Sequence, residues 1–376
     1  MMRILHLITR MDRGGSAVNT LISATEQLKQ GHDVVLGLGL SEESDMSADE
    51  SHRVEESMAV FKVLGGVVKK IPSLKRSLGL HDWRACREIS ALLDTGFDLV
   101  HTHTSKAGVL GRLAVGKKTR VVHTPHGHIF HGYFGTLKTR LFIVIERWAA
   151  RRSDALIALT KAEMDDHLKL GIGTAEQWHI VPSGVDIGAI SRRVDEIRSA
   201  EGYQPEWDAV SVGRLVPVKG MERLVQAWAV VCKRRADARL AIIGDGAERA
   251  VLERLAKDLG VEKNIHFAGW ADPLSYLAAA RSFVLLSHNE GMGRAVIEAF
   301  AASLPCVVSN VCGLSELVDE EVGHCVDADR PDDVAHALLS DWGAEIGEHA
   351  RIRADSYSVE AMIDGLSQLY ETLCHD

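Results

Sequence analysis

Two glutamates eight residues apart, Glu290 and Glu298, form the most informative pattern in the sequence. Glu290 lies in a glycine-containing stretch after an apolar run, and Glu298 falls in a helical pattern among apolar neighbours. A carboxylate in apolar surroundings needs a hydrogen-bonding or charged partner. The two carboxylates could accept hydrogen bonds from hydroxyl groups at two places on one ligand. A helix-capping Glu290 and a salt-bridged Glu298 are the structural alternative.

Arg214 and Lys219 are candidates for binding phosphate. Both lie between a predicted strand, 209–212, and a helical pattern, where the dipole of the following helix favours anions. Arginine offers phosphate a planar fork of donors, and lysine offers a compact charge. Two cations at one strand end suggest a diphosphate, and two solvated surface charges are the alternative. Val218 occupies a position where a Walker A loop needs glycine, which excludes that motif.

Two glycine pairs follow predicted strands. Gly14 and Gly15 begin a helical pattern, where backbone amides can approach an anion closely, although an ordinary turn would look the same. Gly244 and Gly246 do not complete a dinucleotide-binding motif, because its third glycine would fall on Arg249.

Four histidines fall within nine residues: His123, His126, His128 and His131. No cysteine or carboxylate accompanies them, and a cluster of histidines alone is a weak metal signal. Three interpretations remain: a ligand-contacting histidine, structural hydrogen bonding and, with the least support, metal ligation. We therefore name no metal ligand. His101 and His103 end an earlier predicted strand and share one of its faces by alternation.

Short apolar runs alternate with helical patterns along nearly the whole chain, as is typical of parallel strands covered by helices. The predicted strands are 3–9, 33–40, 58–64, 98–103, 120–124, 155–159, 179–182, 209–212, 239–243, 264–268, 282–286, 306–309 and 322–326. The clearest predicted helices are 16–30, 81–94, 106–115, 137–151, 332–341 and 359–373. The acidic stretch 41–56 is expected to be a solvated loop.

The pattern predicts an α/β fold with two tandem Rossmann-like domains and a cleft between them. We expect an N-terminal domain at 1–185, a linker at 186–206 that could contain one helix, a C-terminal domain at 207–355, and a final helix at 356–376 that could pack back on the N-terminal domain. Ligands in open parallel sheets bind at the carboxyl ends of the strands, so the cleft is the expected site.

Composition limits the class of protein. The 376 residues include 43 Lys+Arg and 52 Asp+Glu, giving a formal net charge of −9, which argues against general nucleic-acid binding. The six cysteines form no C-x-x-C pair, as expected of free thiols in a reducing compartment. No stretch approaches the 18 apolar residues that a membrane span needs, and the start resembles a strand rather than a signal peptide. We therefore expect a cytoplasmic protein.

Taken together, these motifs resemble the retaining glycosyltransferases of the GT-B fold, family four. Glu290 and Glu298 match the E-x7-E signature of this family, and Gly313 with Glu316 matches its following G-x-x-E element. Further matches are Ser287, Gly291 and Gly293 around the first glutamate, 212–214 with 219–220 in the donor-phosphate motif, and Gly14 with Gly15 in the N-terminal loop. The segments 101–108 and 123–128 resemble the branch that builds capsular polysaccharide, exopolysaccharide and lipopolysaccharide. Met292 stands where phenylalanine is commoner.

The resemblance implies a role for each of these residues. The C-terminal domain would bind the nucleotide sugar, with Glu298 on the ribose and Glu290 on the sugar ring, assisted by the amides of Gly291, Met292 and Gly293. Arg214 and Lys219, next to Gly213, would neutralise the diphosphate leaving group with help from the Gly15 amide. His126 would contact the transferred sugar or the acceptor, and His101 and His103 are acceptor-side candidates. The resemblance implies no cofactor and no catalytic metal.

The expected function is transfer of a hexose or N-acetylhexosamine, with retention, from a nucleoside-diphosphate sugar to a glycan or polyprenyl-linked acceptor. UDP-sugars are favoured as donors, with GDP-sugars second. A nucleotide-sugar epimerase or hydrolase, and a non-catalytic partner subunit, are the rival classes. The helix expected at 137–152 combines apolar residues with five basic ones, so it could lie on the cytoplasmic face of the inner membrane or pack in the core.

Overall fold

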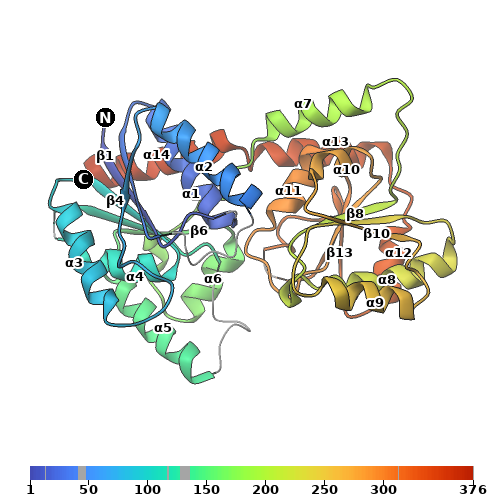
Figure 1. Cartoon of the computed structure of the whole chain (residues 1–376), viewed down its shortest axis with the longest axis horizontal. Coiled ribbons are helices and arrows are strands. Elements are labelled where there is room, and N and C mark those ends of the chain that lie inside the picture. The colour runs from blue at the N-terminus through green and yellow to red at the C-terminus, as the bar shows by residue number, and fades with distance from the viewer. Residues whose placement is uncertain (13, 41–47, 117, 128–135, 312, 376) are drawn as a thin grey trace. The chain divides into compact units, whose positions relative to one another are not determined.

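The computed structural model describes residues 1–12, 14–40, 48–116, 118–127, 136–311 and 313–375 (Figure 1). The chain forms two compact units, Met1–Gly184 with Val359–Asp376, and Val185–Ser358. Each unit is built on one parallel sheet covered by helices. The predicted α/β class with two tandem sheets is therefore confirmed.

The first unit contains a seven-stranded sheet in the order β3-β2-β1-β4-β5-β6-β7. Its strands are β1 (Arg3–Ile8), β2 (Asp33–Leu38), β3 (Val67–Lys70), β4 (Leu99–His103), β5 (Arg120–Thr124), β6 (Ala155–Ala158) and β7 (Trp178–Ile180). Its helices are α1 (Gly15–Lys29), α2 (Ala48–Val63), α3 (His81–Leu93), α4 (Ser105–Ala114), α5 (Thr136–Ala150), α6 (Lys161–Lys169) and α14 (Val359–His375), with the short 3-10 helix η2 (Ala175–Gln177).

Alternating residues of the central strands enter two different cores. On β1, Leu5 and Leu7 face the side packed by α3 and α4. Ile4 and Ile8 face the other side, where Ile4 packs against α14 and Ile8 against α1. The period of two along a strand explains why runs that are apolar on both faces predict these strands well.

The final helix, α14, belongs to the first unit although it follows the second in the sequence. Met362, Leu366 and Tyr370, one helical turn apart, pack against strand residues such as Leu99 and Val122. This helix therefore completes the hydrophobic core of the N-terminal sheet.

The second unit contains a six-stranded sheet in the order β10-β9-β8-β11-β12-β13. Its strands are β8 (Ala209–Val212), β9 (Leu240–Ile243), β10 (Ile265–Gly269), β11 (Phe283–Leu285), β12 (Cys306–Ser309) and β13 (Gly323–Val326). Its helices are α7 (Ile187–Arg198), α8 (Met221–Arg234), α9 (Arg249–Asp258), α10 (Pro273–Ala278), α11 (Arg294–Ala301), α12 (Pro331–Leu338) and α13 (Ala344–Asp355), with η3 (Pro217–Lys219) before α8.

The strand predicted at 58–64 is wrong, because these residues belong to helix α2 and the turn after it. Val54, Met58 and Phe61, spaced four and three residues apart, pack on the core. Val60 and Val63, which made the run look like a strand, are exposed. The period is therefore helical, and the strand of this region is β3, a few residues later. Of the loop expected at 41–56, residues 41–47 lie outside the described residues and the remainder is helical.

The segment expected to be a linker, 186–206, is instead part of the second unit. It contains α7, which begins at Asp186, whose side chain accepts a hydrogen bond from the Ala189 amide. Ser191 donates to the Ala301 carbonyl at 2.9 Å, and Arg198 donates to the Ala278 carbonyl at 3.1 Å. The charged residues that suggested a linker form the outer face of a packed helix.

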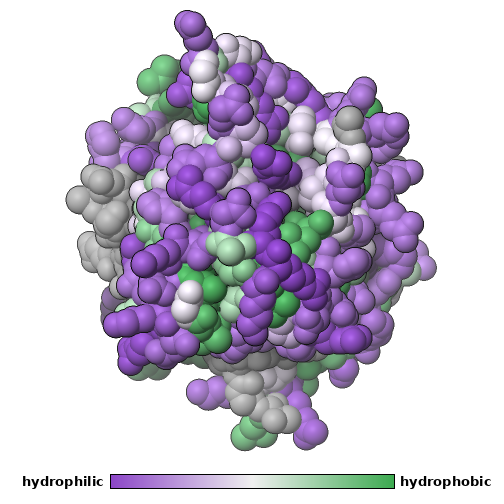
Figure 2. Space-filling model, turned by 90° about the vertical axis from the view of Figure 1, so that its right-hand side faces the viewer, coloured by the Kyte–Doolittle hydropathy of each residue, from purple (hydrophilic) through white to green (hydrophobic). Residues whose placement is uncertain are grey.

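Among the described residues, no helix is long and apolar enough to cross a membrane. The face drawn in Figure 2 is mostly hydrophilic, with hydrophobic side chains gathered in small patches.

Candidate functional site

Lys219 and Glu290 form an ion pair at the carboxyl edge of the second sheet, with 2.5 Å between Nζ and Oε2. Lys219 follows β8 and Glu290 follows β11, and these strands are neighbours although 71 residues separate the two side chains. Ser287 also donates to Glu290, at 3.2 Å. The chain leaves β8 toward β9 on one side, whereas β11 lies on the other side, so the pair sits at the point where ligands bind in open α/β sheets.

Glycines allow the loops at this edge of the sheet to pack closely against one another. Gly220, which precedes α8, has φ of 61°, and a Cβ there would lie 2.1 Å from the Leu286 carbonyl oxygen. Gly313 has φ of 81°, and a Cβ there would lie 2.4 Å from the carbonyl oxygens of Glu290 and Gly291. Any side chain at either position would push apart the loops that carry Lys219 and Glu290.

Arg214 lies in the same turn as Lys219 but is exposed. No ion pair joins its guanidinium to another residue of the described ranges. Leu215, the next residue, is buried and donates its amide to the Asp245 carbonyl at 2.9 Å. The turn is therefore anchored in the sheet, while Arg214 projects a cation from it.

Glu298 lies on α11, one turn after Arg294. Burial raises the pKa of the Glu298 carboxyl, and the positive charge of Arg294 opposes that rise. Burial also lowers the pKa of Arg294, which Glu298 opposes. The sequence predicted this helix and the apolar neighbours of Glu298. It did not predict that Arg294 is the charged partner.

The backbone between the two glutamates turns sharply into α11. Gly293 precedes the helix with φ of 71°, and no side chain caps the helix start. The Met292 side chain is buried at 3% exposure, so only its backbone can face a ligand. Gly291 lies half-buried beside Gly313.

In the first unit, Gly14 and Gly15 lie at the start of α1, as the sequence predicted. Both are exposed, and no side chain caps this helix. Asp12 accepts a hydrogen bond from the Gly14 amide at 2.7 Å. The start of α1 thus has the dipole and the open backbone that an anion needs.

His126 follows β5 and is half-buried, with φ of 59°. Its Nε2 lies 2.9 Å from Nδ1 of His103. His123, by contrast, lies against α4, with Nδ1 at 2.9 Å from the Thr102 hydroxyl. His123 and His126 therefore do not converge on one metal, and His128 and His131 lie outside the described residues.

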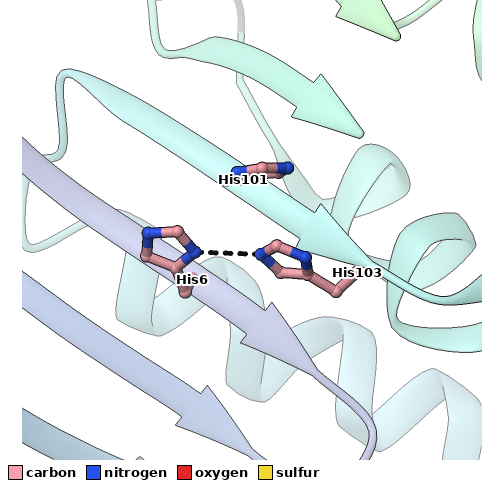
Figure 3. A group of neighbouring side chains, drawn as sticks. All are labelled: His6, His101 and His103. Atoms are coloured by element: carbon pink, nitrogen blue, oxygen red, sulfur yellow. Dashed lines mark hydrogen bonds between the residues drawn. The ribbon is translucent and has the colours of Figure 1, made fainter. Parts of the chain in front are cut away.

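Three more histidines cluster behind His126 at the edge between β1 and β4: His6, His101 and His103 (Figure 3). His6 and His103 are 2.9 Å apart between Nδ1 and Nε2. His101 and His103 lie on one face of β4, with ring centroids 4.0 Å apart, which confirms the predicted alternation. The strand order reverses between β1 and β4, because β2 and β3 lie on one side of β1 and β4 lies on the other. The same reversal occurs between β8 and β11.

The donor set of this cluster does not fit a metal ion. All six ring nitrogens have protein partners, and beyond the bonds between the rings these are Gln27 at 2.7 Å, Tyr370 at 2.5 Å, Thr124 at 2.7 Å and His126 at 2.9 Å. A cation would have to displace several of these hydrogen bonds. The cluster is a buried hydrogen-bonded network.

Sequence reasoning missed Glu163, which holds the loop that carries His126. Its carboxyl group accepts hydrogen bonds from the amides of Gly127, at 2.6 Å, and Leu159, at 2.7 Å. Burial raises the pKa of Glu163 to about 7, against the effect of these two bonds. Thr160 caps α6 three residues before it, so the T-x-x-E spacing could have drawn attention to this residue.

A surface hollow of about 550 Å³ lies at the opposite edge of the second sheet, lined by Trp207, Asp208 and Arg239 among others. These residues precede β8 and β9, whereas ligands of such sheets bind at the carboxyl ends. We therefore place the candidate site at the carboxyl edges and not in this hollow.

Two family models match the chain. "Glycosyl transferase 4-like domain" matches residues 14–184, and "Glycosyl transferases group 1" matches residues 193–342. The first covers the edge that carries Gly15 and His126, and the second covers the edge that carries Lys219 and the two glutamates.

Sequence relatives and a solved structure support the same assignment as the two family models. The D-inositol 3-phosphate glycosyltransferase of Corynebacterium urealyticum is 30% identical over 306 residues, 74% of this chain and 72% of the relative. The Escherichia coli UDP-Gal:alpha-D-GlcNAc-diphosphoundecaprenol alpha-1,3-galactosyltransferase is 29% identical over 282 residues, 72% and 73% of the two chains. Anabaena HepE in complex with UDP has the same fold, with a TM-score of 0.79 at 20% identity over 99% of this chain and 100% of HepE. The chain belongs to the GT-B glycosyltransferases of the family-four type.

Proposed function

We propose that this protein is a retaining, metal-independent glycosyltransferase that moves a hexose or N-acetylhexosamine from a UDP-sugar to a glycan or lipid-linked acceptor in cell-surface polysaccharide synthesis. A GDP-sugar is the second choice of donor. The observation that carries the proposal is the Lys219–Glu290 pair beside the exposed Arg214, at the carboxyl edge between β8 and β11. Two cations and a carboxylate at this position suit a diphosphate joined to a sugar.

Each charged group has one assigned task. Arg214 and Lys219 stabilise the negative charge that grows on the β-phosphate as the glycosidic bond breaks. Because both cations belong to a turn that is anchored in the second sheet, they take the place of a divalent ion in this step. Glu290 leaves its pairing with Lys219 to accept hydrogen bonds from the sugar ring, with the amides of Gly291, Met292 and Gly293 beside it.

The remaining assignments rest on position and on the family resemblance. Glu298 accepts hydrogen bonds from the ribose hydroxyls. Gly15 contributes its amide to the diphosphate, and His126 contacts a hydroxyl of the transferred sugar or the acceptor. The departing phosphate takes the proton of the acceptor hydroxyl, so the sugar is delivered with retention and no protein base is required.

The comparisons support the choice of substrates. The E. coli relative carries UDP-Gal and a diphosphoundecaprenol acceptor in its name, and HepE was solved with UDP. We therefore infer a uridine donor and a polyprenyl-linked acceptor for this chain.

A lipid-linked acceptor requires access to a membrane surface, and α5 is the part of the chain suited to it. Leu137, Leu141, Val144 and Trp148, spaced four, three and four residues apart, are all exposed. Five basic residues accompany this stripe: Lys138, Arg140, Arg147, Arg151 and Arg152. The opposite face, with Glu146, Ala149 and Ala150, is buried. We infer that the exposed face of α5 lies on an anionic bilayer at the cytoplasmic side.

Thermal unfolding with UDP, GDP, ADP, CMP and dTDP, each with and without magnesium, tests the donor. A ligand that binds only the folded state stabilises it by about 2.7 kcal/mol at a hundred times its dissociation constant. We expect UDP to raise Tm equally with and without magnesium, and Glu298→Ala to remove the effect. Glu253→Ala, which breaks a surface pair with Arg249, is the matched control. No shift with any nucleotide would contradict the proposal, and release of free sugar or epimer without acceptor would favour the rival enzymes.

Vesicle sedimentation tests the membrane assignment. Vesicles of phosphatidylglycerol and phosphatidylethanolamine should bind the protein, and those of phosphatidylcholine should not. The double variant Leu141→Ser/Val144→Ser should lose binding, whereas Val60→Ser/Val63→Ser, which changes exposed valines of α2, should retain it. Equal binding by both double variants would contradict the role of α5.

A further inference from the structure

Four side chains form an unbroken hydrogen-bonded row from the interior of the first unit to its carboxyl edge. Gln27 on α1 lies 2.7 Å from Nε2 of His6 on β1. Nδ1 of His6 lies 2.9 Å from Nε2 of His103 on β4 (Figure 3). Nδ1 of His103 lies 2.9 Å from Nε2 of His126. The row ends at the residue to which the proposed function assigns a substrate hydroxyl.

Burial keeps these three imidazoles neutral. It lowers the pKa of His6 to about 4 and that of His126 to about 3, and it lowers the pKa of His103 well below its ordinary value. A neutral imidazole has one N–H donor and one lone-pair acceptor, so each ring carries its proton either on Nδ1 or on Nε2.

The direction of the row follows from its inner end. The amide oxygen of Gln27 can only accept, so Nε2 of His6 donates to it and Nδ1 of His6 accepts. His103 must then donate from Nε2 and accept at Nδ1. His126 must donate from Nε2, which leaves the lone pair on its Nδ1.

Two further side chains, Tyr370 and His101, lie at the inner end of the row. The hydroxyl of Tyr370 lies 2.5 Å from Nδ1 of His101. Burial raises the pKa of Tyr370, and the Gln27 side chain opposes that rise. Gln27 contacts His6 through its amide oxygen, at 2.7 Å, and its Nε2 has no hydrogen-bond partner among the described residues.

We propose that Gln27, His6 and His103 are positioning residues that hold His126 in its Nε2–H tautomer, so that Nδ1 accepts a hydrogen bond from a substrate hydroxyl. No other side chain of the described residues hydrogen-bonds to the His126 ring. The Glu163 carboxyl accepts a hydrogen bond from the adjacent Gly127 amide. The position of the loop backbone and the tautomer of the His126 ring therefore depend on different contacts. The identity of the hydroxyl rests on the proposed function, whereas the tautomer does not.

The tautomer can be read directly from the Nδ1 and Nε2 resonances of ¹⁵N-histidine-labelled full-length protein, with His126→Asn used for assignment. We expect wild-type His126 to be protonated at Nε2. His103→Leu should give a mixture of tautomers, because the acceptor for the Nε2 proton is gone. His103→Asn should restore the wild-type form, because its amide oxygen can take the place of Nδ1.

Kinetics give a second readout. His103→Leu should raise KM for the sugar-bearing substrates about three- to tenfold, as loss of a neutral hydrogen bond predicts, with UDP affinity unchanged. His103→Asn should restore KM. His101→Leu is the matched control, because His101 is equally buried on the same strand but bonds to Tyr370 and Thr124. It should lower stability without changing the His126 tautomer.

Protonation of His126 at Nδ1 in the wild type would overturn the proposal, whether or not the His103 variants fold. An unchanged tautomer in folded His103→Leu would also overturn it. The expected tautomers in a protein without transferase activity would instead count against the proposed function alone.

Discussion

The carboxyl edges of the two sheets are built alike but carry opposite chemistry. Each lies where the strand order of the sheet reverses, between β1 and β4 in the first unit and between β8 and β11 in the second. The second edge carries charges, with the Lys219–Glu290 pair and the exposed Arg214. The first carries imidazoles whose pKa values burial has lowered. The difference teaches that the described side chains of the second edge supply fixed charges, whereas the imidazoles of the first edge supply neutral hydrogen-bonding groups.

Removal of Lys219 tests the charged edge most strongly. Lys219→Ala should lower kcat about 10²- to 10³-fold, the usual effect of losing one fixed donor to a developing anion, and should change donor KM less. Steady-state kinetics with a UDP-sugar would measure both. Arg234→Ala, which breaks an exposed pair between the end of α8 and Asp332 on α12, should leave kcat unchanged. Wild-type turnover in Lys219→Ala would remove the lysine from the proposed reaction.

Glu163 in the first unit should make stability depend on pH. The pKa of Glu163 is about 7 in the folded protein, against an ordinary value of 4.5, so the folded state binds more protons between these pH values. The free energy of unfolding should therefore fall by about 3 kcal/mol as pH rises from about 4.5 to 7. Urea unfolding across this range would measure the slope.

The variant Glu163→Gln should flatten that slope, even though the amide loses one of the two acceptor positions. Glu88→Gln, which changes an exposed carboxylate of the same unit, should keep it. The same slope in Glu163→Gln and wild type would place the titration elsewhere.

Glu298 links function and stability in the second unit. Glu298→Gln should weaken UDP binding ten- to a hundredfold, which is about 1.5–3 kcal/mol for a charge-assisted hydrogen bond. Because the charge of Glu298 offsets the burial of Arg294, the variant takes a counter-charge from that guanidinium, and Tm without ligand should fall. Calorimetry measures both effects, and Glu253→Gln is the surface control. Wild-type affinity in Glu298→Gln would contradict the ribose assignment.

His126 should give the smallest effect. His126→Ala removes one neutral hydrogen bond and should lower kcat/KM about three- to tenfold, while UDP affinity stays unchanged. Because burial lowers the pKa of His126 to about 3, activity between pH 5 and 8 should not show its titration. A change in UDP affinity would place His126 on the nucleotide and weaken the contrast between the edges.

Most of the fold could be predicted from the sequence, because buried parallel strands are short apolar runs with apolar faces on both sides. The strands at 120–124, 209–212 and 306–309 match the structure residue for residue. The prediction failed at 58–64 because an apolar run at the end of an amphipathic helix looks like a strand until its exposed valines are known. It allowed a helix in the linker but did not predict that this helix, α7, packs as part of the second unit, because charges on one helix face resemble those of a loop.

The sequence by itself determined the glutamate pair, the two cations and the glycine turns, because each is a local pattern set by chain spacing. Tertiary structure alone decided that Lys219 pairs with Glu290 and that His6 meets His103. The partners are 71 and 97 residues apart, and only the order of strands in each sheet makes them neighbours. Burial in turn decided which groups stay charged, because the free energy of ionisation depends on the surroundings that the fold creates.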